Sequence, residues 1–173
     1  MADETGLLLQ PLVRRTWGPR GQPPVLYSWD RRDRLSVISV LGVSPHRRRL
    51  TLFFRMYSSN VCHRDFQQFA IEVMRHFPRG VVWVLDRWSV HRAAASRLQK
   101  RFPRRFCVEW LPPYAPELNP VEQVWTRTKY GRLANYIPED LNALRRSARL
   151  ALRHLGNQQT SLKSCFIHAK LKL

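Results

Sequence analysis

The apolar run Val81-Val-Trp-Val-Leu85, which is followed by Asp86, constrains the fold of this chain more than any other segment. Consecutive apolar residues rich in Val are typical of a strand buried on both faces, as in the central strands of α/β domains. Asp86 would then stand at the end of a central strand, where α/β sheets bind ligands. Because an unpaired carboxylate there costs several kcal/mol, Asp86 needs a compensating partner.

The segments around this strand predict alternating strands and helices. Residues 35–43 and 50–57 are apolar runs joined by Ser44-Pro-His-Arg-Arg-Arg49, and they predict a hairpin with a basic tip. The remaining apolar patterns predict helices over residues 64–77, 93–102, 121–130 and 138–155 and a strand over residues 106–111. Residues 112–120 contain four prolines, so we expect them to lie outside regular structure. These elements predict one α/β domain with a mixed sheet over residues 1–155, followed by a basic tail over residues 156–173.

The charge of the chain predicts a polyanionic partner. Lys and Arg number 30 against 12 for Asp and Glu, which gives a net charge of +18. Arginine matches phosphate oxygens in a bidentate way, so nucleic acid is the expected partner. The alternative is that many arginines face solvent without a ligand. Arg145, Arg149 and Arg153, on one face of a predicted helix, either follow a phosphate backbone or face water.

Two further features predict a soluble protein of a reducing cytoplasm. No apolar run approaches the roughly 20 residues of a membrane-spanning helix, and the acidic start of the chain is unlike a secretory signal. Cys62, Cys107 and Cys165 are odd in number and lack metal-site spacing, so we expect ordinary thiols.

Three acidic residues each have a structural interpretation when taken alone. Asp86 can pair with Arg87 or Arg92 or cap the following turn, and Asp3 can belong to a frayed end. Glu122 is the third residue after Asn119, an arrangement that predicts a capping box.

Taken together, the same three residues predict a metal site. If Asp3 lies on a strand beside Asp86, and the proline-rich loop returns Glu122 to the same place, three carboxylates converge. Carboxylates that close are tolerated when cations hold them, and oxygen ligands select Mg²⁺ or Mn²⁺. Two such ions suit displacement at a phosphodiester.

Four segments resemble the DDE superfamily endonuclease domain of mariner-like bacterial insertion-sequence transposases. They are Asp3-Glu-Thr-Gly6, Arg15-Thr-Trp-Gly-Pro-Arg-Gly-Gln22, Leu85-Asp-Arg-Trp-Ser-Val-His91 and Leu111-Pro-Pro-Tyr-Ala-Pro-Glu-Leu-Asn-Pro-Val-Glu-Gln-Val-Trp125. The resemblance runs from Asp3 to about Ile137. It implies a ribonuclease-H-like fold, an α/β mixed sheet flanked by helices, in which the first and fourth strands are neighbours and Asp3, Asp86 and Glu122 form the metal-binding triad.

The function that the resemblance implies is that of a transposase catalytic domain over residues 1–155. Its reaction is Mg²⁺- or Mn²⁺-dependent cleavage of element ends, with two ions, followed by attack of the freed 3′-hydroxyl on target DNA. The expected partner is double-stranded DNA, namely element ends and target, in the bacterial cytoplasm and nucleoid. Candidate further partners are a second copy, giving a homodimer, and the product of an upstream helix-turn-helix frame.

The resemblance also singles out residues around the triad. His91 matches a histidine of the family pattern, and it either contacts DNA, assists near the metals or is a buried structural residue. Trp17 and Arg20 are expected in a loop that touches DNA. Trp88 and Trp125 are expected to pack around the site. Arg87 stands where the pattern usually has Asn.

The start of the chain departs from the family pattern. A helix-turn-helix region and the first half of the first strand are expected ahead of Asp3, where only two residues stand. One hypothesis is a downstream frame joined to an upstream one by frameshifting. The other is an inactive, truncated remnant that binds DNA non-specifically. A nuclease that acts on RNA or RNA–DNA hybrids is a third hypothesis.

Overall fold

The computed structural model describes residues 1–28, 33–46 and 49–172. Its strands are β1 Ala2–Leu8, β2 Arg34–Val43, β3 Leu50–Tyr57, β4 Val81–Leu85 and β5 Phe106–Trp110. Its α-helices are α1 His63–Arg75, α2 Ser89–Arg101, α3 Pro120–Arg127, α4 Leu141–Gly156 and α5 Gln159–His168. A 3₁₀ turn, η1 Pro116–Leu118, precedes α3, and a π-turn, η2 Thr128–Arg132, follows it.

Strands β1, β2 and β3 form an antiparallel sheet with β2 in the middle. The predicted hairpin is confirmed as β2 and β3, which pair from Val43 with Leu50 onward. Of its basic tip, Arg47 and Arg48 lie outside the described residues. All seven residues of β1 pair with β2, and Asp3 stands opposite Ser39.

Strands β4 and β5 are parallel and are connected by α2. β1 contacts β4, so the first and fourth strands are neighbours as expected, but they are not paired, and the described strands form two hydrogen-bonded sheets side by side. The prediction that β4 is buried on both faces is only partly right. Trp83 and Leu85 are buried, whereas Val82 is 60% exposed because one face of this strand lacks a covering helix at that position.

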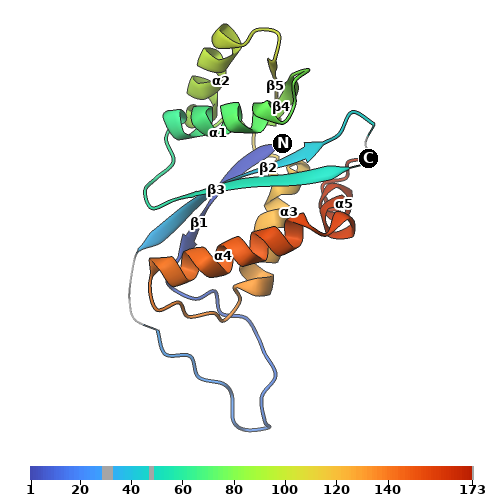
Figure 1. Cartoon of the computed structure of the whole chain (residues 1–173). Coiled ribbons are helices and arrows are strands. Elements are labelled where there is room, and N and C mark those ends of the chain that lie inside the picture. Colours follow the sequence, from blue (N-terminus) through green and yellow to red (C-terminus); the bar gives the residue numbers. More distant parts are fainter. Residues whose placement is uncertain (29–32, 47–48, 173) are drawn as a thin grey trace.

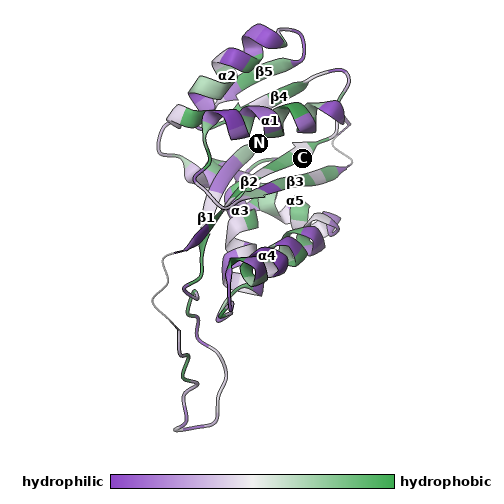
Figure 2. Cartoon of the chain, turned by 60° about the vertical axis from the view of Figure 1, so that its left-hand side comes forward, coloured by the Kyte–Doolittle hydropathy of each residue, from purple (hydrophilic) through white to green (hydrophobic). Residues whose placement is uncertain are grey.

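The helices form two layers, with α1 and α2 on one side of the strands and α3, α4 and α5 on the other (Figure 1). Alternate residues of β2 belong to the two cores that result, since successive side chains of a strand point to opposite faces. Leu35, Val37 and Leu41 pack with α3, α4 and α5, whereas Ile38 and Val40 pack with α1, α2 and β4. Hydrophobic residues run along β4 and β5 in Figure 2, and hydrophilic residues cover much of α4.

Three helical segments differ from the sequence predictions. α2 begins at Ser89, four residues before the predicted start, directly after the end of β4. The proline-rich segment contains the 3₁₀ turn η1, with Pro116 at its first position, where the missing N–H is harmless. The predicted basic tail contains α5, whose Leu162, Cys165 and Phe166 are buried against the rest of the core.

No helix among the described residues is long and apolar enough to cross a membrane.

A long connection, residues 9–33, joins β1 to β2 and is named the arm here (Figure 1). A hydrogen bond from Leu9 N–H to the Asp33 carbonyl closes its base at 3.1 Å. One limb is anchored beyond η2, because Leu12 bridges to Ala134 and the Asn135 side chain bonds both N–H and C=O of Arg14. Farther out, Trp17 is 99% exposed.

Candidate active site

Two adjacent acids of β1 point to opposite faces of the sheet, as the alternation of a strand requires. The Asp3 side chain meets Trp125 of α3, in the layer below, and the Glu4 side chain meets His91 of α2, in the layer above. One short strand therefore brings an acid to each of the two helical layers.

The Asp3 carboxylate is buried and held by one strong donor. Trp125 Nε1 donates to Asp3 Oδ2 at 2.9 Å, and both side chains are almost fully enclosed. Burial raises the pKa of Asp3 to about 7, and the negative charges of Glu122 and Glu4 act in the same direction, whereas the Trp125 hydrogen bond opposes them. The surroundings of Asp3 thus disfavour its ionised form, and a nearby cation would stabilise that form.

Asp86 directly follows β4 and finds its partner on α2. Its Oδ1 accepts from the Trp88 backbone N–H at 3.1 Å and lies 2.5 Å from His91 Nδ1. The alternative of a cap for the following turn is therefore met, but the pair with Arg87 or Arg92 is not among the ion pairs of the described residues. Burial alone would raise the pKa of Asp86, but the hydrogen bond and charge of His91 and the Trp88 N–H lower it overall.

His91 bridges two carboxylates that lie 82 positions apart in the sequence. Its Nε2 lies 2.9 Å from Glu4 Oε1, and its Nδ1 lies against Asp86. Since carboxylates accept hydrogen bonds, both ring nitrogens donate and the imidazole is cationic. Burial lowers the pKa of His91, but the hydrogen bonds and charges of Asp86 and Glu4 outweigh it and raise the pKa to about 9.

The His91 ring is also packed between aromatic rings. The Phe66 ring meets it at 4.6 Å between centroids and the Trp88 ring at 5.6 Å, both edge-on. Its side chain is 0% exposed, so it does not reach DNA directly. Of the alternatives stated for this residue, a buried role next to the carboxylates fits the geometry.

Glu122 stands in the first turn of α3, which the loop before it fixes in place. Asn119 Oδ1 accepts from Val121 N–H at 3.2 Å, and Asn119 Nδ2 donates to the Ala2 carbonyl of β1 at 3.3 Å. The predicted N-cap at Asn119 and the proline at the first helical position are confirmed. The reciprocal bond of a capping box is not formed, because the Asn119 N–H donates to the Pro116 carbonyl and not to Glu122. Among the described residues the Glu122 carboxylate has no hydrogen-bond partner, so it is free to bind a ligand.

The three carboxylates line one cavity of about 390 Å³. Asp3 comes from β1, Asp86 from the end of β4 and Glu122 from α3. The proline-rich loop and Arg87 complete the wall. The remaining lining residues are Leu111, Pro112, Pro113, Tyr114, Ala115, Pro116 and Asn119.

The match of a family model agrees with this arrangement. The model of the DDE superfamily endonuclease matches residues 1–145. The chain belongs to this family. A comparison with curated proteins gave no match.

Solved structures of Mos1 share the fold of this DDE endonuclease. The Mos1 mariner paired-end complex with Mn matches with a TM-score of 0.59 at 13% identity, over 99% of this chain and 55% of that chain. The Mos1 strand transfer complex matches with a TM-score of 0.58 at 14% identity, over 99% of this chain and 54% of that chain. The predicted ribonuclease-H-like fold is thus confirmed, and the chain spans about half the length of the structures it matches.

The cavity of this DDE endonuclease fits a divalent cation by its donor set. Its negatively charged oxygen donors are the carboxylates of Asp3, Asp86 and Glu122. Burial, and then the charges of Glu122 and Glu4, raise the pKa of Asp3, and a cation would offset those charges. Across the described ranges, however, no three His, Cys, Asp or Glu side chains are drawn close enough to hold an ion as they stand. Binding would therefore require the carboxylates to come closer together, and that of Glu122 is the least restrained of the three.

Glu4 and Lys129 join the site without having been predicted. Glu4 carries no sequence signal for its contact with His91. Lys129 lies seven residues after Glu122, a spacing that places both on one helix face and that a search of helix faces would have found. Burial lowers the pKa of Lys129, while the charges of Glu122 and Asp3 oppose that shift.

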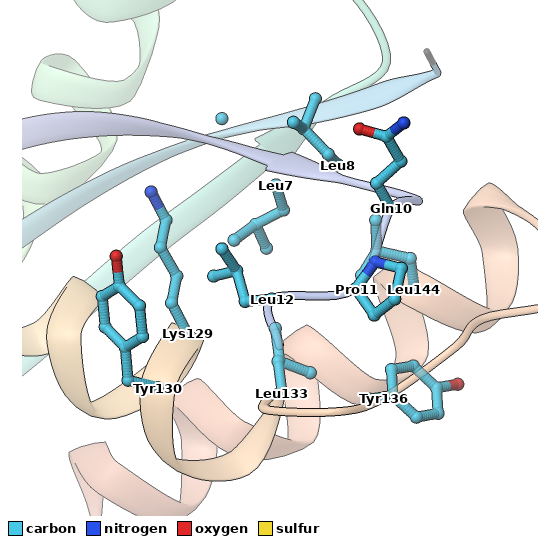
Figure 3. Close-up of a pocket in the computed structure, with 11 residues that line it drawn as sticks. Leu7, Leu8, Gln10, Pro11, Leu12, Lys129, Tyr130, Leu133, Tyr136 and Leu144 are labelled. Carbon is cyan, nitrogen blue, oxygen red and sulfur yellow. The ribbon is translucent and has the colours of Figure 1, made fainter. Parts of the chain in front are cut away.

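Lys129 also lines a second, mostly apolar cavity of about 150 Å³ between β1, the start of the arm and the segment after α3 (Figure 3). The side chains of Leu7, Leu12 and Leu133 form its apolar wall. Lys129 therefore stands between this cavity and the carboxylates of Asp3 and Glu122.

The other predicted residues lie farther out. Trp17 and Arg20 are exposed on the arm. Arg145 donates to Ser58 Oγ at 2.7 Å. Arg149 and Arg153 are exposed on α4, away from the carboxylate cavity.

Proposed function

We propose that this chain is the catalytic domain of a DNA transposase, which cleaves element ends and joins the freed 3′-hydroxyl to target DNA. The observation that carries the proposal is the single cavity lined by Asp3, Asp86 and Glu122, from three separate elements. The family match and the fold shared with the Mos1 paired-end and strand transfer complexes support it.

The three carboxylates would hold two Mg²⁺ or Mn²⁺ ions. Bound there, such ions supply activation of the attacking oxygen and stabilisation of the leaving oxygen at a phosphodiester. The crowding of Asp3 by Glu122 and Glu4 supports the assignment, because bound cations would offset that repulsion.

The surrounding residues orient two of the three carboxylates in advance. Trp125 fixes one oxygen of Asp3, while His91 and the Trp88 N–H hold Oδ1 of Asp86 and leave its Oδ2 available. Glu122 is positioned only through its backbone, by the Asn119 cap. Of the three carboxylates, that of Glu122 is therefore the one that can adjust its position when a cation binds.

Double-stranded DNA is the proposed partner, as element ends and as target. The net charge of +18 favours binding of phosphates. Since the chain spans about half the length of the matched Mos1 chains, we include a second copy and an upstream helix-turn-helix product in the proposed assembly. The exposed Trp17 of the arm offers contact area for a second copy or for the helix-turn-helix product. In a bacterial cell, the protein would act on DNA in the nucleoid.

The test is nicking of supercoiled DNA that carries the element ends, with Mg²⁺ or Mn²⁺. Asp86→Asn and Glu122→Gln should lose more than the roughly 10- to 100-fold that removal of an outer contact costs. Glu117→Gln is the matched control, because Glu117 is an exposed acid of the same loop that does not line the cavity. Equal nicking by all four proteins would refute the proposal.

A further inference from the structure

A basic groove, the β3–α4 groove, runs along the free edge of the three-stranded sheet. Two adjoining cavities of about 570 and 500 Å³ form it, and they share Leu52, Phe54 and Arg153. None of their lining residues lines the carboxylate cavity. The groove is therefore a separate surface of the molecule.

The backbone of β3 is open along this groove. β3 pairs with β2 alone, and Ser44 N–H donates to the Arg49 carbonyl, so alternate residues from Arg49 onward face β2. The N–H and C=O groups of Leu50 point outward, and the Gln159 side-chain amide binds both, at 3.0 and 2.9 Å. By the same alternation Leu52, Phe54 and Met56 turn their backbone groups outward, where no described residue pairs with them.

The charges that line the groove are all positive. Arg49 stands at one end, and Arg149 and Arg153 of α4 project from the side. No Asp or Glu lines either cavity, and these three arginines have no ion-pair partner among the described residues. Arg55 also lines the groove but is held by Glu72 at 2.6 Å. Three guanidinium groups thus remain for a ligand.

We propose that the β3–α4 groove binds the phosphate backbone of a DNA segment outside the carboxylate cavity. Arg149 and Arg153 are about one helical turn apart on α4, a rise of about 6 Å, so both guanidinium groups can contact phosphates of the same DNA strand, which follow one another at roughly 3.4 Å along the DNA axis. The open N–H groups of β3 add donors that phosphate oxygens accept. A strand of another protein could pair with the open backbone of β3, but it would leave the three guanidinium groups without a negatively charged partner. The inference takes DNA as ligand class from the proposed function and adds a second contact surface to it.

The test measures binding of a fluorescent DNA duplex to the full chain, with chelator present, between 50 and 200 mM salt. Arg149→Ala/Arg153→Ala should weaken binding and reduce the slope of log affinity against log salt by about 2, one for each lost phosphate contact. Arg92→Ala/Arg97→Ala removes the same charge from exposed positions of α2, across the sheet from α4, and should keep the wild-type slope.

An unchanged slope in the α4 variant, or an equal fall in the α2 control, would overturn the inference. So would an altered oligomeric state of the α4 variant in light scattering with DNA affinity unchanged, because the groove would then be a protein interface. Thermal melting checks that both variants are folded. Since no metal is present, the result is independent of nicking, so the inference can fail or hold separately from the proposed catalytic role.

Discussion

The Asp3 carboxylate is placed where its charge is unfavourable in the absence of a cation. Burial and two neighbouring acids raise its pKa, and a single Trp125 hydrogen bond works against them. In the proposed function this charge would attract the cation, at the cost of some stability in the metal-free protein.

In a chelating buffer, Asp3 and His91 should contribute less to stability as the pH rises from about 4 to 9. The Met1 amino group opposes them, because burial lowers its pKa from 8.0 to about 5 and its unfavourable contribution disappears as the pH rises from 5 to 8. The pKa of Asp3 rises from 3.8 to about 7 on folding, so its contribution is full below pH 3.8 and is lost by about pH 7. The pKa of His91 rises from 6.5 to about 9, so its contribution is full below pH 6.5 and is lost through pH 9. The lowered pKa of Asp86 acts in the opposite direction, with stability lost only as the pH falls below about 4.

Thermal melting at a series of pH values checks this dependence. Asp3→Asn should flatten the part between pH 4 and 7 and raise the melting temperature of the metal-free protein at pH 8, while abolishing nicking. A pH profile that stays unchanged in Asp3→Asn would contradict the placement of the Asp3 carboxyl.

His91, whose other ring nitrogen is held by Glu4, is expected to position Asp86. His91→Ala leaves Glu4 and Asp86 without their shared donor and should cost roughly 1–3 kcal/mol of unfolding free energy. Mn²⁺ affinity, measured by calorimetry, should fall about 10- to 100-fold, as for other residues that orient a ligand.

His91→Gln, which keeps one amide donor, should restore part of the Mn²⁺ affinity. If His91→Ala lowered stability but left Mn²⁺ affinity unchanged, the residue would have a packing role alone.

At the residue scale, Asp86 and Glu122 could be singled out from the sequence because a buried apolar run precedes one and a proline-rich loop precedes the other. They line one cavity together with Asp3, but no three acidic or other ligand side chains of the described residues are close enough to hold an ion as they stand, and their metal-binding role stays a proposal. The Glu4–His91 contact could not be predicted, because it joins residues 87 positions apart through tertiary packing that no local pattern records.

Among the elements, α3 depends most on its first turn, because this turn carries Glu122. Asn119→Ala removes the acceptor for Val121 N–H and the donor to the Ala2 carbonyl, and it should cost about 1 kcal/mol or slightly more of unfolding free energy. Nicking should fall with it, since the loss also loosens α3 from β1.

Asp140→Ala provides the matched comparison. Asp140 caps α4 by accepting from Ala143 N–H at 2.6 Å, and α4 contributes no residue to the carboxylate cavity. Urea unfolding should give similar losses for the two variants, but nicking should fall only in Asn119→Ala. Equal nicking losses would mean that global stability, and not the position of Glu122, controls activity.

The elements with strong periodicity were predictable, and those defined by tertiary contacts were not. α1 has a clear apolar stripe, and the hairpin has two largely apolar runs with a turn between them. α5 has only a short stripe of Leu162, Cys165 and Phe166, and the exposed Ile167 blurs its amphipathic pattern, so its place depends on the core it completes. The lack of hydrogen-bond pairing between the neighbouring strands β1 and β4 also depends on packing, which sequence patterns do not encode.

At the scale of the whole molecule, ion binding should appear as a gain in stability. Mn²⁺ at 100 times its dissociation constant should add about 2.7 kcal/mol to the unfolding free energy, because an assembled site exists only in the folded chain. Thermal melting with and without Mn²⁺ measures the gain, and Asp86→Asn should abolish it. Salt-sensitive DNA binding without any Mn²⁺ effect would instead favour the inactive DNA-binding remnant.

The length of the arm has a consequence for the order in which the chain folds. Six residues separate β2 from β3, whereas 25 separate β1 from β2. Closing the longer loop costs roughly 1 kcal/mol more in chain entropy, and nearby contacts generally form sooner than distant ones. We expect the β2–β3 hairpin to gain amide protection first in pulsed hydrogen exchange and β1 to dock late. In the proposed function, a newly made chain would then stay inactive until β1 docks on β2, because β1 carries Asp3.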